Sequence, residues 1–297
     1  MVNCALITGA SGFIASHLAK RIIVNGWQVG LLVRPHSQLD PELLRAKIYL
    51  YDGTLNSIDQ CIADLKPNIV FHLASTFISE HGPEDIAGLI NSNIVLGAQL
   101  LESMTGHQIK KLINAGSSWQ HFNGYSYNPV NLYAATKQAF EAILEYYVEV
   151  KKISCITLKL FDTYGPNDNR KKIVNLLITS AKTGEHIELS PGEQLIDLVY
   201  IDDIVRAFLM ASEQLGGKER SSHEIYGLSS GSSVSIRELV DIISRVGGKE
   251  IKVSWAARSY REREVMKPWH PSTNLPDWQP QFTLEKGLSN LLLNFLK

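Results

Sequence analysis

The stretch Cys4-Ala5-Leu6-Ile7-Thr8-Gly9-Ala10-Ser11-Gly12-Phe13-Ile14-Ala15 decides the fold. An apolar run that ends in a glycine turn and opens an amphipathic pattern predicts a first strand and its crossover helix. Glycines let the backbone approach a pyrophosphate there, and the amides at the helix N-terminus hold its charge. The spacing, Gly-x-x-Gly-x-x-Ala, is one residue wider at its front than Gly-x-Gly-x-x-Gly. In this context it predicts a dinucleotide-binding site.

The rest of the chain extends this βαβ pattern. Apolar, β-branched runs predict strands at residues 4–8, 29–33, 48–51, 69–73, 111–115 and 155–160, with helices expected at 14–24, 85–103 and 132–150. Parallel strands need helical crossovers, so the sequence predicts a doubly wound α/β fold with a parallel sheet.

The pattern changes after residue 165. Helices are expected at 172–182, 202–214, 236–245 and 283–295, with shorter strands between them. We therefore expect a dinucleotide-binding domain at 1–165 and a smaller α/β substrate-binding cap at 166–297. Residues of about 194–215 are expected to return to the first domain.

Composition narrows the functional class. The 297 residues carry a formal net charge of −1 and are 44% hydrophobic, which gives no basic surface for nucleic acid or anionic membrane. Three widely spaced cysteines indicate core residues in a reducing compartment. The N-terminus lacks a signal-peptide pattern, no apolar run is long enough to span a bilayer, and the histidines show no ligand spacing. We expect a cytoplasmic protein without a metal site.

The end of the second predicted strand bears on cofactor choice. A carboxylate there would bind the 2′-hydroxyl of NAD, but the sequence has Arg34 directly after Val33. A guanidinium suits a phosphate dianion. The sequence therefore favours NADP(H), and NAD(H) remains possible.

Tyr133 and Lys137 stand four residues apart at the start of a long helical pattern. Residues at this spacing share a helix face, so the ammonium is expected to lower the pKa of the phenol. Ser117-Ser118 follows the fifth predicted strand, where a hydroxyl can hydrogen-bond the same substrate oxygen. We expect Ser118, Tyr133 and Lys137 to be catalytic.

These motifs, in this order, resemble extended short-chain dehydrogenases/reductases of the nucleotide-sugar epimerase/dehydratase group, over nearly the whole chain. At a finer level the chain resembles bacterial reductases of CDP-linked 4-keto-6-deoxyhexoses. The resemblance implies that Lys137 also binds the nicotinamide ribose and Tyr133 lies at the cofactor. It implies further cofactor contacts from the glycine turn, the third and fourth strands and the next helix: Thr8, Gly9, Ser11, Gly12, Phe13, Ile14, Asp52, Gly53, Leu73, Ala74, Ser75 and Asn93.

Departures from the family pattern sharpen the expected reaction. Dehydratases of the group carry Thr-Asp-Glu where this chain has Ser118-Trp119-Gln120, and an indole and an amide cannot transfer the protons of dehydration. Ile196 stands where the family often places an arginine on the substrate diphosphate, which leaves Lys172 and Arg261 as candidates. Trp119, Gln120 and Asp162, which replaces a family asparagine, are further expected substrate contacts.

The expected reaction is NADPH-dependent reduction of the C4 ketone of a nucleotide-linked 4-keto-6-deoxyhexose. A nucleotide-sugar 4-epimerase with tightly bound NAD is an alternative, and a non-catalytic dinucleotide sensor is another. The helical segments 85–103 and 132–150 carry more apolar surface than one sheet face uses. Since relatives pair two such helices across a two-fold axis, we expect a homodimer with a four-helix bundle, with Tyr146 and Tyr147 as candidate interface or core residues.

Overall fold

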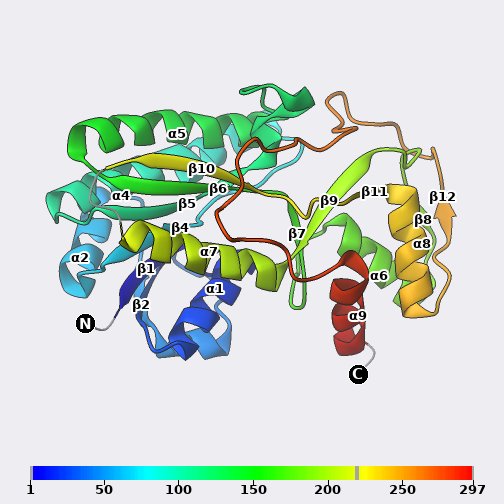
Figure 1. Cartoon of the computed structure of the whole chain (residues 1–297), viewed down its shortest axis with the longest axis horizontal. Coiled ribbons are helices and arrows are strands. Elements are labelled where there is room, and N and C mark those ends of the chain that lie inside the picture. The colour runs from blue at the N-terminus through cyan, green and yellow to red at the C-terminus, as the bar shows by residue number, and fades with distance from the viewer. Residues whose placement is uncertain (1–2, 218–220, 296–297) are drawn as a thin grey trace.

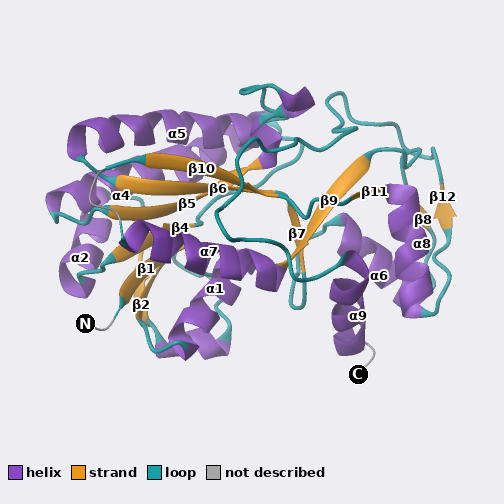
Figure 2. Cartoon of the chain, in the orientation of Figure 1, coloured by secondary structure: helices purple, strands orange, loops and turns teal. Residues whose placement is uncertain are grey.

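A seven-stranded parallel sheet organises the larger part of the chain (Figures 1 and 2). The structure is a computed structural model that describes residues 3–217 and 221–295. The strand order is β10-β6-β5-β4-β1-β2-β3. The strands are β1 (Cys4–Thr8), β2 (Gln28–Val33), β3 (Lys47–Leu50), β4 (Ile69–His72), β5 (Lys111–Ser117), β6 (Ser154–Leu160) and β10 (His223–Leu228). The predicted doubly wound fold is confirmed.

Helices cover both faces of this sheet (Figure 1). One face carries α2 (Leu55–Leu65), α4 (Leu96–Gly106) and α5 (Leu132–Lys151), and the other carries α1 (Phe13–Val24) and α7 (Ile201–Gly216). The helical run before α4 is not uniform, because α3 (Ile86–Ile90) passes into one π-helical turn, η3 (Asn91–Val95). Buried apolar side chains fill each side of the sheet, as amphipathic helices require.

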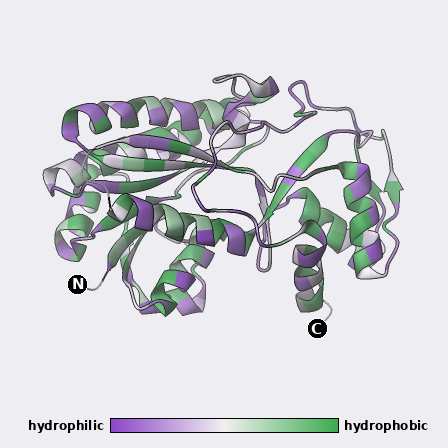
Figure 3. Cartoon of the chain, viewed as in Figure 1, coloured by the Kyte–Doolittle hydropathy of each residue, from purple (hydrophilic) through white to green (hydrophobic). Residues whose placement is uncertain are grey.

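The smaller part of the molecule has two short sheets. One has the order β11-β9-β7, built from β7 (Asp162–Tyr164), β9 (Leu195–Tyr200) and β11 (Ser233–Ser235). The other pairs β8 (Ile187–Glu188) with β12 (Val253–Ser254). Around them lie α6 (Ile173–Thr183), α8 (Ile236–Gly247) and α9 (Leu284–Phe295), and Figure 3 shows how α8 separates hydrophobic from hydrophilic residues.

The two parts interleave along the chain. Helix α7 packs on α1, β5 and β6 although it follows cap strand β9. Strand β10 then pairs in parallel with β6 and completes the main sheet. The sequence did not predict this strand. One continuous core therefore runs from the α1 side of the sheet into the cap. Within the described residues, no helix is long and apolar enough to cross a bilayer.

Short 3-10 turns complete the structure. They are η1 (Pro41–Arg45), η2 (Pro83–Asp85), η4 (Ser118–Gln120) and η5 (Phe122–Gly124). The turn η4 directly follows β5, so it carries the predicted catalytic serine at the carboxyl edge of the sheet. The three cysteines are buried and unpaired.

Candidate active site

The glycine turn after β1 leaves a backbone cradle at the N-terminus of α1. Gly9 has a φ of +79°, and a Cβ there would lie 2.7 Å from the Cα of Ala74. Gly12 precedes α1 without a side-chain cap, and the first turn of α1 holds no acidic residue. Free amides and the positive end of the helix dipole favour an anion here. The residues present therefore fit the diphosphate of a dinucleotide.

Thr8 supports this turn from within. Its hydroxyl lies 2.9 Å from Nδ1 of His72 and accepts a 3.1 Å hydrogen bond from the backbone N–H of Ala74. Burial lowers the pKa of His72 to about 3, so the ring that shares this hydrogen bond with Thr8 is neutral. Thr8 and Ala74 thus hold the ends of β1 and β4 together, and neither lines the cavity described below.

Asn93, in the π-helical turn, ties the loop after β4 to α5. Its side-chain oxygen accepts from the N–H of Thr76 at 2.7 Å and from the hydroxyl of Ser75 at 3.1 Å. Its amide nitrogen donates to the carbonyl of Thr76 and to Oγ1 of Thr136. A π-helical turn often marks a functional site. Here it places the side-chain amide of Asn93 between the loop after β4 and helix α5, so that the amide hydrogen-bonds both. Asn93 positions Ser75, which does line the cavity.

Helix α5 begins so that its first turn faces this loop. Asn131 caps the helix, because its side-chain oxygen accepts from the N–H of Ala134 at 3.0 Å. The same amide donates to the carbonyls of Ile78 and Ser79. The cap places Tyr133 and Lys137 one turn apart on the face that lines the cavity.

The pKa of the Tyr133 phenol differs from the sequence prediction. Burial raises it to about 12, and the hydroxyls of Ser117 and Ser75 and the charge of Arg170 only partly oppose that effect. Burial likewise lowers the pKa of Lys137 to about 8. The expected lowering of the phenol's pKa is therefore wrong for the protein alone, because desolvation outweighs the groups that oppose it. A phenol with this pKa stays protonated at neutral pH, as a proton donor must.

Two neighbouring serines lie close to the phenol of Tyr133. Both Ser117 and the predicted Ser118 line the cavity. Ser117, like Ser75, is a hydrogen-bond partner of Tyr133, and its Oγ also accepts from the N–H of Trp119 at 3.2 Å. Sequence reasoning placed the hydroxyl one residue later, at the first residue of η4. The structure thus places Ser117 beside the three residues predicted to be catalytic.

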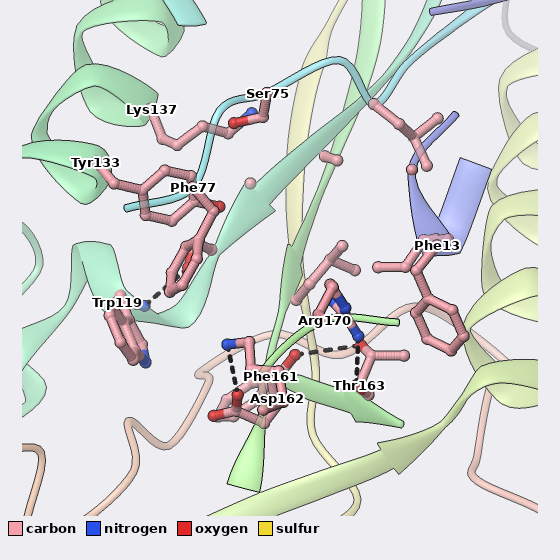
Figure 4. Close-up of a pocket in the computed structure, with 18 of the residues that line it drawn as sticks. Phe13, Ser75, Phe77, Trp119, Tyr133, Lys137, Phe161, Asp162, Thr163 and Arg170 are labelled. Carbon is pink, nitrogen blue, oxygen red and sulfur yellow. Dashed lines mark hydrogen bonds and ion pairs between the residues drawn. The ribbon is translucent and has the colours of Figure 1, made fainter. Parts of the chain in front are cut away.

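These groups open into a cavity of about 580 Å³, a volume typical of ligand sites. In Figure 4, Tyr133, Phe77 and Trp119 lie on one side, and Phe13 and Arg170 on the other. Phe77 is 43% exposed, and the centre of its ring lies 5.0 Å from that of Tyr133 and 5.5 Å from that of Trp119. An aromatic wall thus stands beside the phenol. The other predicted residues that line the cavity are Gly9, Gly12, Phe13, Ile14, Leu73, Ser75, Ser118, Lys137, Asp162 and Lys172.

Cations from the loop before α6 face this wall. Lys172 pairs with Asp162 at 3.1 Å, and its ammonium lies 4.3 Å from the ring centre of Phe77. Arg170 donates to Asp168 and to the carbonyl of Thr163, and its guanidinium stacks 4.5 Å above the ring of Phe13. Arg170 therefore connects the start of α1, next to the glycine turn, to the cap.

Other predicted contacts lie elsewhere. Gln120, the last residue of η4, is fully buried and does not line the cavity, so a substrate in the cavity does not reach it. Arg261 is half-exposed and lies 3.7 Å from Glu80. Arg34 is exposed after β2, and the carboxylate of Asp52 accepts from Thr54. These four residues, with Ser11 and Gly53, do not line the cavity.

The sequence did not single out Phe77, Asn131 or Arg170, and of the pair Ser117-Ser118 only Ser118 was predicted to be catalytic. Ser117 and Arg170 carried visible signals, because one adjoins the predicted serine and the other opens the run Arg170-Lys171-Lys172. Phe77 and Asn131 carried none, since their roles depend on how the loop after β4 packs against α5.

Known proteins resemble this chain over most of its length. Residues 5–227 match the NAD dependent epimerase/dehydratase family. The chain is 30% identical to CDP-abequose synthase of Yersinia pseudotuberculosis, over 91% of this chain and 93% of that protein. It is 25% identical to UDP-glucose 4-epimerase of Mycolicibacterium smegmatis, over 96% of each.

Solved structures show the same fold. UDP-glucose 4-epimerase of Thermotoga maritima, solved with UDP-glucose, superimposes with a TM-score of 0.86 at 22% identity over 98% of both chains. MoeE5 in complex with UDP-glucuronic acid and NAD gives a TM-score of 0.84 at 22% identity, again over 98% of both. The resemblance inferred from the motifs is confirmed: the chain belongs to the NAD dependent epimerase/dehydratase family, and is an enzyme of that family.

Proposed function

We propose that this protein reduces the C4 ketone of a nucleotide-linked 4-keto-6-deoxyhexose with NADPH. The observation that supports the proposal most directly is which acidic side chains line the cavity. Among the described residues that line it, the only carboxylate is Asp162, which is paired with Lys172. Tyr133 is therefore the available proton donor, and there is no pair of carboxyl groups for dehydration.

The chain's own residues divide the work. A bound nicotinamide supplies the hydride. Tyr133 donates its phenolic proton to the C4 oxygen as that oxygen gains charge, and a hydroxyl of Ser117 or Ser118 hydrogen-bonds the same atom. Lys137, charged below about pH 8, stands beneath the phenol and offers an ammonium to the cofactor ribose. Holding ketone and nicotinamide together in the cleft supplies much of the rate.

Two features support the sugar and cofactor assignments. The wall formed by Phe77 and Trp119 beside Tyr133 suits an apolar substituent next to C4, such as the methyl group of a 6-deoxyhexose. Arg34 after β2, without a neighbouring carboxylate in residues 29–37, suits the 2′-phosphate of NADPH. The similarity to CDP-abequose synthases favours a CDP-linked substrate.

A nucleotide-sugar 4-epimerase is the second candidate, because 4-epimerases are also among the relatives and the similar structures. The two functions differ in how the cofactor is held. Purified protein should be denatured and the released cofactor identified, and NADPH oxidation followed with nucleotide-linked and free 4-keto sugars. An empty or exchangeable site with turnover only of the nucleotide-linked sugar supports the reductase. Stoichiometric bound NAD supports the epimerase.

A further inference from the structure

A buried charged cluster that the proposed reaction does not use lies behind the serines. Lys159 on β6 places its ammonium 2.8 Å and 2.6 Å from the two carboxylate oxygens of Glu141 on α5. The two side chains are only 1% and 4% exposed. Glu141 stands one helical turn after Lys137 and two turns after Tyr133.

Gln120 connects this ion pair to the serine turn, which is Ser117 and Ser118 at the junction of β5 and η4. Its side-chain nitrogen donates to Glu141 at 3.1 Å and to Gln138 at 2.8 Å. Its side-chain oxygen accepts from the backbone N–H of Ser117 at 2.9 Å. The side-chain nitrogen of Gln120 therefore bonds to α5, and its side-chain oxygen bonds to the end of β5.

The backbone of β5 packs directly on the cluster. A Cβ at Gly116 would lie 2.8 Å from Cδ of Lys159 and 3.1 Å from a carboxylate oxygen of Glu141. Any shift of the pair would thus move the strand end that carries Ser117. Burying two charges is expensive, and an apolar pair of similar volume is often as stable, so stability alone is a weak reason for the ion pair.

We propose that Gln120, Glu141 and Lys159 are positioning residues that hold the serine turn in register with Tyr133 and Lys137. The cluster joins β5, β6, α5 and η4, the four elements whose relative placement sets the distance from the serine hydroxyls to the phenol. It also explains why Gln120, at the place of a dehydratase glutamate, is turned away from the cavity.

The cluster acts electrostatically on Lys137 as well. Burial and the charge of Lys159 lower the pKa of Lys137, and Glu141 raises it. The histidines nearby add little charge, because burial lowers the pKa of His72 to about 3 and also lowers that of His121. Near neutral pH the balance of Lys159 and Glu141 therefore dominates the charge around Lys137.

The inference rests on the acid–base role proposed for Tyr133 and Lys137, and variants of Gln120 test it. Gln120→Met keeps the volume and removes the hydrogen bonds, so kcat should fall roughly 5–10-fold at every pH, the effect of about one buried hydrogen bond. Gln120→Glu places a second carboxyl against Glu141. Because it must take up a proton to fit, its kcat relative to wild type should fall as pH rises from 6 to 9.

Controls separate positioning from folding. Glu149→Gln removes an exposed carboxylate from the same helix and should leave kcat and its pH profile unchanged. Lys159→Arg keeps the charge and should retain more activity than Lys159→Met. Wild-type kcat and an unchanged pH profile in both Gln120 variants, with only a lower melting temperature, would overturn the positioning role.

Binding of NADPH, followed by nicotinamide fluorescence, needs no sugar. Wild-type protein that binds NADPH but turns over no nucleotide-linked keto sugar would contradict the proposed function. The positioning role predicts that the pH dependence of NADPH affinity differs between Gln120→Glu and wild type, since Lys137 borders the cofactor site. An identical dependence in the two would count against the positioning role.

Discussion

The cofactor side and the substrate side of the cavity are built in different ways. On the proposed cofactor side, Gly9, Gly12 and Phe13 come from one strand–helix junction, and Tyr133 and Lys137, which border both sides, come from one helix turn. On the substrate side, Phe77, Trp119 and Lys172 come from three distant segments that meet only in the folded protein. In the proposed mechanism, the acid–base chemistry thus depends mainly on local geometry, whereas selection of the sugar depends on tertiary packing.

The largest effect should come from the cofactor side. Tyr133→Phe removes the proton donor and keeps the ring against Phe77, so turnover should fall at least about 10²-fold with little change in stability. Steady-state kinetics and a thermal melt check both parts. Near-normal turnover would remove Tyr133 from the mechanism.

Removing the side chain proposed to bind the 2′-phosphate of NADPH should have a smaller effect than Tyr133→Phe. Arg34→Ala should raise KM for NADPH roughly 10-fold, since a charge-assisted hydrogen bond is lost at an exposed site, and leave KM for NADH nearly unchanged. Arg45→Ala, at another surface-exposed arginine, is the matched control. A wild-type enzyme that prefers NADH would contradict the role of Arg34.

Substrate binding should distinguish two cations. Lys172 lines the cavity, so Lys172→Ala should raise KM for the nucleotide sugar roughly 5-fold and change kcat less. Arg261 lies outside it beside Glu80, so Arg261→Ala should have the smaller effect. The reverse order would mean that the cap closes further over the substrate than the structure shows.

Assembly should matter least for the chemistry. The proposed two-fold dimer would cover the exposed Tyr146 and Val150 on α5, whereas Tyr147 is buried and donates to Glu102. The double change Tyr146→Asp with Val150→Asp should give a monomer in light scattering, with activity within about 2-fold of wild type because the cavity lies in one chain. Val24→Asp on α1 should remain dimeric. A wild-type monomer at micromolar concentration would contradict the dimer.

The same contrast explains how far the sequence could predict the molecule. The strand–turn–helix at residues 4–24 was predicted almost to the residue, because glycine conformation and apolar periodicity act locally. Strand β10 was missed, since its run His223–Leu228 begins with polar residues and finds its place only through pairing with β6. The inward turn of Gln120 was missed for a similar reason, because its partners Glu141 and Gln138 lie on another element.

The most direct test of the proposed reaction follows the hydrogen at C4. The protein should be incubated with a nucleotide-linked 4-keto-6-deoxyhexose and NADPH deuterated at both C4 positions of the nicotinamide, and the product analysed by mass spectrometry. A ketoreductase transfers the label, so the product alcohol should carry one deuterium at C4 in proportion to NADPH consumed. An unlabelled product, or a sugar epimerised without NADPH consumption, would contradict the reductase and favour an enzyme that recycles its own bound cofactor.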